Sequence, residues 1–526
     1  MALGRSQVQQ RFENPREILG DRLKEGSIYR LLADHGHTLF GDDYFADLYA
    51  DSVRGQPTIP ARVMATVMLL QAYEGLSDAE ATDRLGFDLR WQAACGVDTG
   101  YVAFHPTSLV GQRNRLRTSS RPRRIFEDTK VVAKSSGAMK TRARIFDSTP
   151  IYDAVATQDT VTQLRAVIRK LLIVLDRAGE LGLATRVRGA LSRDDDYATP
   201  GKPPCDWDDK QAREQLVDEL VRDCLATLSV LEGQNLTGAS RDAADLVALV
   251  AGQDTEQGDD GVFRIAKKVV RNRMISTVDP EARHGHKSKA RKFDGFKAHL
   301  SLDPDSELID EVLLTPANTP DKNAVPALVE SLKNDEEEPP GIVGDAAYGD
   351  GATRAELKDA GLTIMAKVPP VRNMTGGFPK DRFIIDLETK SVTCPQGRSV
   401  PIRFAHDKSG TAHFAPHCSA CPLATKCTRS KHGRTITINR HEGLIQQARA
   451  DQADPEWKAR YRADRPMVER KISHFVRRPW GGRKARTRGL KRVATDIDTR
   501  AGAINLARLA ILGLTFGPDG WRIAGT

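Results

Sequence analysis

The sequence predicts a multidomain α/β protein, and three observations support this fold class. Its 526 residues are more than a single hydrophobic core accommodates. Helical periodicity dominates residues 1–125, whereas β-branched and aromatic residues become frequent after residue 261. Short apolar runs then alternate with short amphipathic helices up to residue 368. We therefore expect an all-α N-terminal domain followed by a mixed sheet with insertions.

Residues 1–125 are expected to be helical and to resemble a helix-turn-helix. The capping box Ser77–Glu80 opens one helix, and Gly86 gives a tight turn into a second helix over residues 89–94. A further helix carries three arginines, Arg113, Arg115 and Arg117. These arginines favour contact with DNA, and a plain helical bundle is the alternative.

The central part of the chain has the element order of an RNase H-like mixed sheet. Strands are followed by a helix, a strand, a helix, a strand and a late helix. Two long amphipathic helices form an insertion after the first strand, and a β-rich segment with cysteines forms another after the last. The expected strands of the core cover residues 143–147, 262–277, 293–303, 308–314, 341–345 and 362–368.

The chain is expected to divide into four parts, each with its own composition. They are the helical DNA-binding domain at 1–125, the first part of the core at 126–374 with its helical insertion at about 152–261, the β-rich insertion at 375–440, and a completing segment at 441–526 with a glutamate-bearing helix and a basic stretch.

Three acidic residues lie in unusual settings for solvated carboxylates. Asp147 ends the apolar run Ile145-Phe146, Asp345 ends the run Ile342–Gly344, and Glu469 lies in an arginine-rich stretch with helical spacing. Ligand sites in open α/β sheets gather at strand ends. Three carboxylates supply oxygen ligands for two Mg²⁺ ions. The sequence thus predicts a two-metal phosphoryl-transfer site, and simple turns capped by the two aspartates are the alternative.

Four cysteines form a second candidate metal site. One CxxC pair and two further cysteines fit a tetrahedral Zn²⁺ knuckle, and two nearby histidines, His413 and His417, could replace a thiolate. The alternative is a set of reduced, half-buried thiols. The four cysteines are Cys394, Cys418, Cys421 and Cys427.

The charge of the chain favours a polyanionic partner. The net charge is +9 and the pI is about 9.1. Basic residues recur every two or three positions from Lys458 to Arg492, and a glycine-rich loop with a tryptophan lies within this stretch. This loop is expected at the surface in contact with DNA, and a plain surface tail is the alternative. Its candidate contact residues are Arg477, Arg478, Trp480, Arg483, Arg486 and Arg488.

Targeting signals are not evident in the sequence. The N-terminus lacks the apolar segment of a secretory signal, and no run of about 18 apolar residues indicates a membrane span. Seven cysteines without such a signal do not indicate a disulfide framework. We expect a cytoplasmic protein without a membrane partner.

The chain resembles the insertion-sequence DDE transposases, whose catalytic core is RNase H-like. The resemblance spans about residues 55–513 and rests on segments that occur in the family's order. One departure is that Tyr461 and Arg465 are one residue further apart than the commonest spacing of the family. Another is that the downstream basic residue is an arginine, Arg477 or Arg478, rather than a lysine. The matching segments are Phe146–Thr149, Thr277–Arg283, Phe293–His299, Leu314–Asn318 with Asp321, Gly344–Gly349 and Tyr461–Glu469.

The resemblance implies a DNA transposase that uses two Mg²⁺ or Mn²⁺ ions held by Asp147, Asp345 and Glu469. Such an enzyme cleaves a phosphodiester at each element end and joins the freed 3′-OH to target DNA. The implied partners are double-stranded DNA, namely the terminal inverted repeats and the target, and further copies of the chain in a homodimer or higher oligomer at the nucleoid. A structure-specific nuclease and a non-catalytic repressor are the alternative functions.

The helix around Glu469 is expected to contact DNA as well. Its candidate residues would bind phosphates or orient the carboxylate, and a solvated basic face is the alternative. They are Tyr461, Arg465, Arg470 and Lys471.

Overall fold

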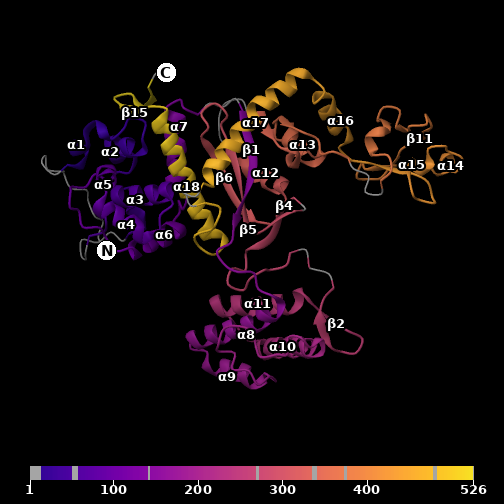
Figure 1. Ribbon diagram of the computed structural model, residues 1–526, viewed down its shortest axis with the longest axis horizontal. Helices are drawn as coiled ribbons and strands as arrows, with labels where there is room; N and C mark the ends of the chain where they lie inside the picture. Colours follow the sequence, from indigo (N-terminus) through magenta and orange to yellow (C-terminus); the bar gives the residue numbers. More distant parts are fainter. Residues whose placement is uncertain are drawn as a thin grey trace.

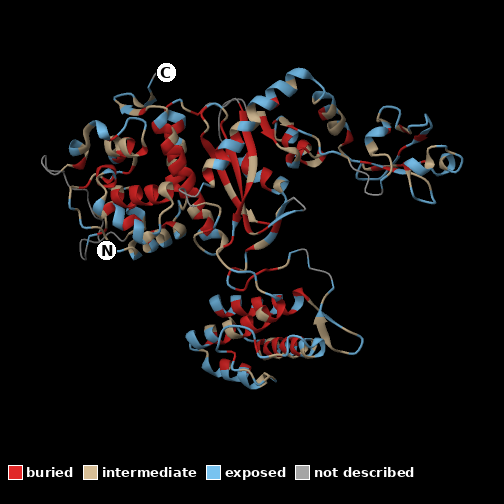
Figure 2. Cartoon of the chain, in the orientation of Figure 1, coloured by how far each residue is buried: buried red, intermediate tan, exposed pale blue. Residues whose placement is uncertain are grey.

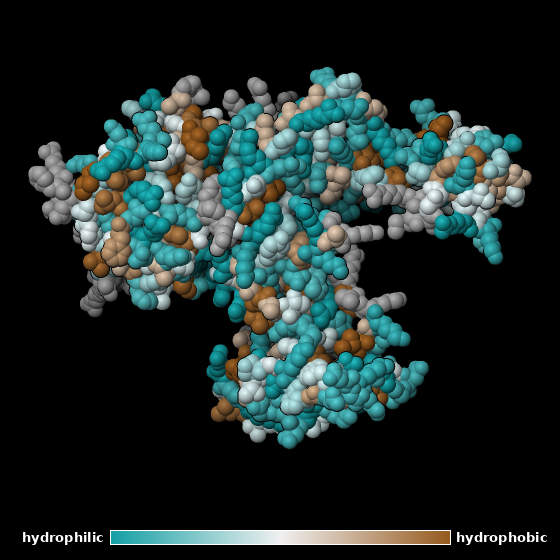
Figure 3. Space-filling model, viewed as in Figure 1, coloured by the Kyte–Doolittle hydropathy of each residue, from teal (hydrophilic) through white to brown (hydrophobic). Residues whose placement is uncertain are grey.

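The computed structural model describes residues 14–49, 57–139, 143–267, 270, 272–288, 290–333, 341–371, 376–477 and 482–524. A central sheet lies between an all-helical N-terminal part on one side and a β-rich segment on the other (Figure 1). A group of helices with a core of its own hangs below the sheet. Hydrophilic residues cover most of the visible face (Figure 3). None of the helices in these ranges is long and apolar enough to cross a membrane.

The central sheet is mixed. β5 runs antiparallel to β1, β4 and β6, whereas β7 and β8 continue the sheet parallel to β1. The order is β4-β5-β1-β7-β8, with β6 paired to β5. The predicted mixed α/β architecture is therefore confirmed. The strands are β1 (Ala143–Tyr152), β4 (Arg283–Ser288), β5 (Arg291–Leu302), β6 (Ile309–Pro316), β7 (Gly341–Gly344) and β8 (Ile364–Ala366).

Strand β1 is twice as long as predicted. It was expected to end at Asp147, but residues 148–152 continue to pair with β5. Its parallel pairing with β7 stops at Ile145. Asp147 therefore lies inside β1, at the point where one of its two neighbouring strands ends.

A segment from the basic loop takes the place of β7 beside the second half of β1. The N–H of Tyr152 donates to the carbonyl of Arg483 (2.6 Å), and the N–H of Ala485 donates to the carbonyl of Tyr152 (2.7 Å). Because backbone N–H groups alternate between the two edges of a strand, position 150 faces the same edge as Tyr152. Pro150 is tolerated there because it removes no hydrogen bond to β5.

Both faces of the sheet are buried (Figure 2). Ile145 and Ile151 pack in one core with α17 (Pro455–Phe475) and α18 (Leu490–Ile511). Phe146 packs on the other face in a core with α12 (Val325–Lys333) and α13 (Gly351–Asp359). Asp147 has the same parity as Ile145 and Ile151 and therefore faces α17.

The N-terminal part is helical, as predicted, and the capping box of Ser77 and Glu80 is present. The turn predicted at Gly86 is wrong, because α4 continues to Phe87 and Asp88 caps α5. Residues 91–95 of α5 are all buried, so α5 lacks the exposed face that a DNA recognition helix requires. The helices are α1 (Pro15–Leu19), α2 (Ile28–Leu39), α3 (Ala61–Glu74), α4 (Asp78–Phe87), α5 (Leu89–Cys95), α6 (Thr107–Thr118) and α7 (Arg124–Ser135).

The helical insertion contains more helices than predicted. Besides the two expected long helices, α8 (Thr160–Arg177) and α10 (Lys210–Leu231), it has α9 (Leu181–Ala190) and α11 (Gly238–Gln253). Apolar side chains from all four helices share one core.

The strand predicted at 262–277 is wrong. Among the described residues of that range, only β3 (Phe263–Ile265) forms, in a hairpin with β2 (Thr255–Gln257). The adjoining strand β4 was missed because its sequence, Arg-His-Gly-His-Lys-Ser, has neither apolar alternation nor β-branched residues.

The β-rich insertion consists of two three-stranded sheets. Two short helices, α14 (Ala415–Cys418) and α15 (Ala424–Cys427), follow β13. Helix α16 (Glu442–Asp451) then returns the chain to α17. The strands are β9 (Ile384–Asp386), β10 (Ser391–Thr393), β11 (Ser399–Pro401), β12 (Arg403–Phe404), β13 (Gly410–His413) and β14 (Thr435–Ile438).

Helix α18 belongs to two cores. Its first half packs against the sheet through Val493 and Ile497, and its second half packs among the N-terminal helices through Leu506 and Leu509. A hairpin of β15 (Leu514–Gly517) and β16 (Gly520–Ile523) follows it.

The first turn of α18 is held by two acids from a distant segment. Asp279 accepts a hydrogen bond from the N–H of Gly489 (2.9 Å), and Glu281 accepts one from the N–H of Leu490 (2.7 Å). These carboxylates satisfy amides that have no partner inside the helix.

Replacing Arg144 with methionine should destabilise the sheet. Arg144 in β1 is fully buried, and its guanidinium contacts Asp303 (3.3 Å) and Asp310 (3.1 Å). The substitution leaves two buried carboxylates without this cation, which costs about 3–5 kcal/mol. Hydrogen exchange of the β1 and β5 amides measures the loss. The exposed Arg186 on α9 is the matched control, and equal protection in the two methionine variants would contradict the prediction.

Asp498 should make stability depend on pH. Burial raises its pKa to about 7, against the opposing charge of Arg123, and Glu311 raises it further. Because the carboxyl has a pKa of about 4 in the unfolded chain, the folded state binds the extra proton between about pH 4 and pH 7. Stability should therefore fall as pH rises across that range and level off above it. Asp498→Asn should flatten this slope in thermal unfolding, and an unchanged slope would refute the assignment.

Candidate functional site

The pairing register of β1 and β7 places two of the candidate carboxylates at the same level. Ala143 pairs with Gly341 and Ile145 pairs with Val343. Continuing that register by two residues sets Asp147 opposite Asp345, and adjacent strands lie about 4.8 Å apart. Asp345 directly follows β7, at the carboxyl end of a parallel strand, where ligand sites of open sheets gather.

Asp147 is half-buried against α17. Its carboxylate accepts hydrogen bonds from the N–H of Ser148 (2.7 Å) and from the Arg465 guanidinium (3.0 Å). Burial raises the pKa of this carboxyl, and the charge of Asp345 raises it further, whereas Arg465 and the Ser148 amide lower it. The electrostatic influence of Asp345 on Asp147 agrees with the shared level of the two residues.

Asp345 also binds a backbone amide of the residues that follow it. Its carboxylate accepts a hydrogen bond from the N–H of Ala347 (2.8 Å) and caps the short helical turn Ala346–Tyr348. The turn-capping role that the sequence left as an alternative is thus present at Asp345. Asp147, by contrast, lies within a strand and caps no turn.

Side chains along one face of helix α17 lie over the end of β7. Tyr461 donates its hydroxyl hydrogen to the carbonyl of Gly344 (3.1 Å), next to Asp345. Arg465, one turn later, reaches Asp147. Glu469 follows Arg465 by four residues and is therefore on the same face, where it is exposed.

Tyr461 lies within electrostatic range of all three candidate acids. Burial raises the pKa of its phenol, and Arg465 opposes that rise. Further increases come from the three acids in the order Asp345, Asp147 and Glu469.

A polar cluster on the opposite face of β1 was not predicted. Asp321 accepts hydrogen bonds from the Ser148 hydroxyl (3.1 Å) and from the Lys297 ammonium (2.7 Å). His299 is fully buried beside it, and burial lowers the pKa of its imidazole to about 4. One signal in the sequence could have found the cluster: Lys297, His299 and Asp321 all lie in segments that carry the family resemblance.

Across the described ranges, no three His, Cys, Asp or Glu side chains are gathered closely enough to hold a metal ion. The chemistry of the donors nevertheless fits hard divalent cations, because carboxylate oxygens are the ligands these ions prefer. Asp147 and Asp345 are neighbours whose like charges raise the cost of ionisation, and Arg465 offsets part of it. A cation between them would remove the remaining repulsion.

Two of the basic residues predicted to contact DNA on α17 pair with an acid of the protein. Arg470 pairs with Glu307, and Lys471 lies 3.7 Å from the same carboxylate. Lys471 is only 3% exposed, and burial lowers its pKa to about 8. Lys471 is therefore directed into the protein, whereas Arg470 pairs with Glu307 and remains exposed.

The basic loop is partly structural. Arg483 donates to the Thr149 hydroxyl (2.8 Å), and Arg486 donates to the carbonyl of Leu76. Both are half-buried, so the expectation that they are surface residues is wrong, whereas Arg477 and Arg488 are exposed. Sequence patterns do not reveal this because both partners are distant in the chain. Arg478 and Trp480 lie outside the described residues.

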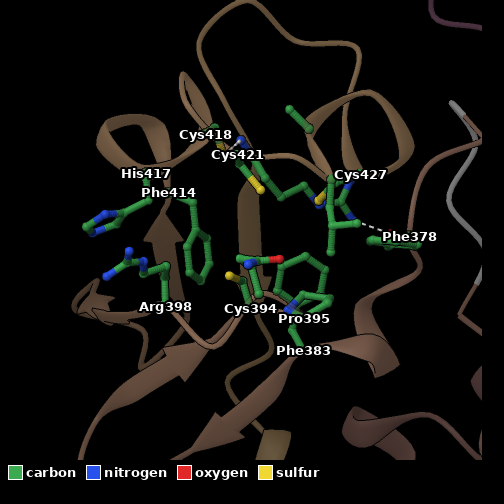
Figure 4. A pocket seen from close by; sticks show the side chains of 14 residues that line it. Phe378, Phe383, Cys394, Pro395, Arg398, Phe414, His417, Cys418, Cys421 and Cys427 are labelled. Atoms are coloured by element: carbon green, nitrogen blue, oxygen red, sulfur yellow. Dashed lines mark hydrogen bonds between the residues drawn. The ribbon is translucent and has the colours of Figure 1, made fainter.

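The four cysteines of the β-rich insertion line one small hollow of about 20 Å³ (Figure 4). Cys418 accepts a hydrogen bond from the N–H of Arg434 (3.4 Å). Burial raises the pKa of the Cys427 thiol, and Cys418, Cys421 and Cys394 raise it further, against the charge of Arg434. The four thiols that the sequence proposed as one group thus line one hollow, although no three of these described side chains are close enough to hold a metal ion.

Two protein-family models match the chain. One, described as a transposase DDE domain, covers residues 393–510, and the other, described as a transposase domain (DUF772), covers residues 17–115. The first range contains Glu469 and the four cysteines, whereas Asp147 and Asp345 lie outside it. No curated protein and no solved structure matches the chain significantly. The two matches confirm the likeness to insertion-sequence DDE transposases and indicate a transposase function.

Proposed function

We propose that the chain is a DNA transposase that cuts DNA at element ends and joins the freed ends to target DNA through Asp147, Asp345 and Glu469. The carrying observation is the β1–β7 register, which brings Asp147 level with Asp345. Helix α17 supports it by contacting Asp147 through Arg465 and the end of β7 through Tyr461.

The RNase H-like core is part of this proposal. Its support is the order of the sheet, with an antiparallel trio β6-β5-β1 extended by the parallel strands β7 and β8. Asp147 lies in β1, Asp345 directly follows the adjacent strand β7, and the third acid lies on a helix that packs on the same face as Asp147. We also propose the division into parts at 1–125, 126–374, 375–440 and 441–526.

The residues of the site have separate tasks in this mechanism. Bound divalent ions would supply Lewis-acid activation of water and of the 3′-OH. Asp147, Asp345 and Glu469 would hold these ions, and Arg465 orients the Asp147 carboxylate. Tyr461 fixes α17 to the end of β7. The chain thereby positions the reacting groups and compensates charge, as phosphoryl transfer requires.

Double-stranded DNA is the proposed partner, as terminal inverted repeats and as target. Among the described candidate residues of the loop, Arg477 and Arg488 are exposed and can reach phosphates. Assembly of two or more copies on DNA also belongs to the proposal, because an element has two ends to be cut and joined.

Asp147→Asn should abolish cleavage and leave DNA binding nearly unchanged. The amide keeps the shape of the side chain but is a poor metal ligand, and losing several kcal/mol of transition-state stabilisation slows cleavage by about 1000-fold or more. A cleavage assay on a duplex with element-end sequence in Mg²⁺ measures the first effect, and anisotropy measures the second.

Asp359→Asn, an exposed change on α13, is the matched control and should retain full activity. Undiminished cleavage by Asp147→Asn would refute the assigned role. Cleavage by the wild-type chain without strand transfer would instead identify a structure-specific nuclease.

We further propose that Cys394, Cys418, Cys421 and Cys427 hold a structural Zn²⁺ ion. The common hollow and the mutual influence of the thiols support this assignment. Four thiolates are the usual donor set of a closed tetrahedral zinc site.

Purified protein should contain one zinc per chain, with sulfur ligands at about 2.3 Å in X-ray absorption spectra. Cys421→Ser should lose zinc, whereas serine at the buried Cys224 of the helical insertion should retain it. Zinc-free protein with four freely titrating thiols would contradict the assignment.

A further inference from the structure

A hollow of about 550 Å³ separates the N-terminal helices from the start of α18. Arg113 and Arg117 of α6 line one side, and Arg486 and Arg492 line the other. Helices α6 and α18 are in contact beside it (Figure 1). Its volume far exceeds the roughly 30 Å³ that one water molecule occupies in the liquid.

The acids that line the same hollow are already engaged. Asp78 pairs with Arg113 at 2.5 Å, and Asp496 lies 3.3 Å from Arg500. Glu80 accepts a hydrogen bond from the N–H of Ser77 (2.7 Å) in the capping box of α4. Asp78 and Asp496 are thus each balanced by an arginine, whereas Glu80 keeps its charge, and four arginines line the hollow against three acids.

Three of the arginines have no such partner. Within the described part of the chain, Arg117, Arg486 and Arg492 form no ion pair with a carboxylate. Arg486 donates to a backbone carbonyl, and Arg117 donates to the Asn114 side chain. Burial lowers the pKa of Arg117, and the charges of Arg492 and Arg113 lower it further. Like charges from two separate elements therefore converge on one space, which favours an anion there.

The basic loop leads from the end of β1 into the hollow. Residues 483–485 are hydrogen-bonded to the end of β1, the strand that carries Asp147. Arg486 and Thr487 then line the hollow, and the exposed Arg488 follows. A polyanion lying along this loop therefore runs from the sheet toward α6.

We infer that this hollow is a phosphate-binding site for duplex DNA, in which Arg117 and Arg492 hold the backbone between the N-terminal helices and the sheet core. The inference rests on the proposed transposase function, which makes duplex DNA the expected polyanion. Arg113 on one side lies in the range that matches one transposase family model, Arg117 follows that range by two residues, and Arg486 and Arg492 on the other side lie in the range that matches the second model. Each arginine neutralises phosphate charge, a contact that carries no base sequence.

The test is a salt titration of binding to a fluorescent duplex of about 30 bp, roughly three helical turns. Each lost phosphate contact lowers the slope of log K against log salt by about one unit. Arg117→Gln and Arg492→Gln should each lower the slope by about one, and the double variant by about two. The matched control removes two exposed arginines of the helical insertion, Arg177→Gln with Arg186→Gln, and should leave the slope unchanged.

Lysine variants test whether misfolding, rather than the loss of charge, lowers the slope. Arg117→Lys with Arg492→Lys keeps both charges and should restore most of the slope. An unchanged slope in the double glutamine variant, an equal loss in the control, or no recovery with lysine would each overturn the inference. A slope loss seen with single-stranded RNA but not with the duplex would assign the site to RNA instead.

The experiments distinguish a refutation of the phosphate-binding site from a refutation of the proposed transposase function. If the wild-type chain binds duplex DNA and Asp147→Asn abolishes cleavage, an unchanged slope in the double variant overturns the phosphate site alone. If the wild-type chain binds no duplex DNA at any salt concentration, the transposase proposal fails together with it.

Discussion

Strand β1 changes its neighbour on one edge along its length, and the candidate site lies where this change occurs. Up to Ile145 the strand lies between β5 and β7, and from Tyr152 a segment of the basic loop replaces β7. Between these two neighbours, within the part of the chain that the structure describes, no strand pairs with this edge, and the carbonyl of Phe146 accepts a hydrogen bond from Arg465 (3.4 Å) beside Asp147. The Asp147 side chain points out of the sheet toward α17, and because β7 ends at Gly344, Asp345 leaves the neighbouring strand beside it.

Charge pairs around β1 specify how its neighbouring elements are placed. Arg144 is held by Asp303 and Asp310 at the start of the strand, and Arg465 binds Asp147 further along. Each pair joins segments that are distant in the chain. Because an isolated buried charge is costly, every such pair favours one placement of its two elements over alternatives. The geometry of the site is therefore set by how these distant elements are placed, and not by a local loop.

Features with local causes could be predicted from the sequence. The capping box of Ser77 and Glu80 and the apolar runs before Asp147 and Asp345 depend on neighbouring residues, and they led to the right elements. Features with distant causes could not. Strand β4 is polar and exists through its pairing with β5. The burial of α5, the cluster around Asp321 and the contact of Arg486 with Leu76 likewise depend on residues far away in the chain.

The position of helix α18 near the end of the sequence determines when the two cores can fold during translation. Its second half completes the core of the N-terminal helices, and its first half completes the core of the sheet. Residues 490–511 leave the ribosome after nearly all their packing partners, so neither core closes while the earlier segments are being synthesised. The N-terminal helices must therefore remain in an incompletely packed form until translation has passed α18. A chain released before that point would expose both apolar surfaces at once, which makes it a target for chaperones and proteases rather than a partly active fragment.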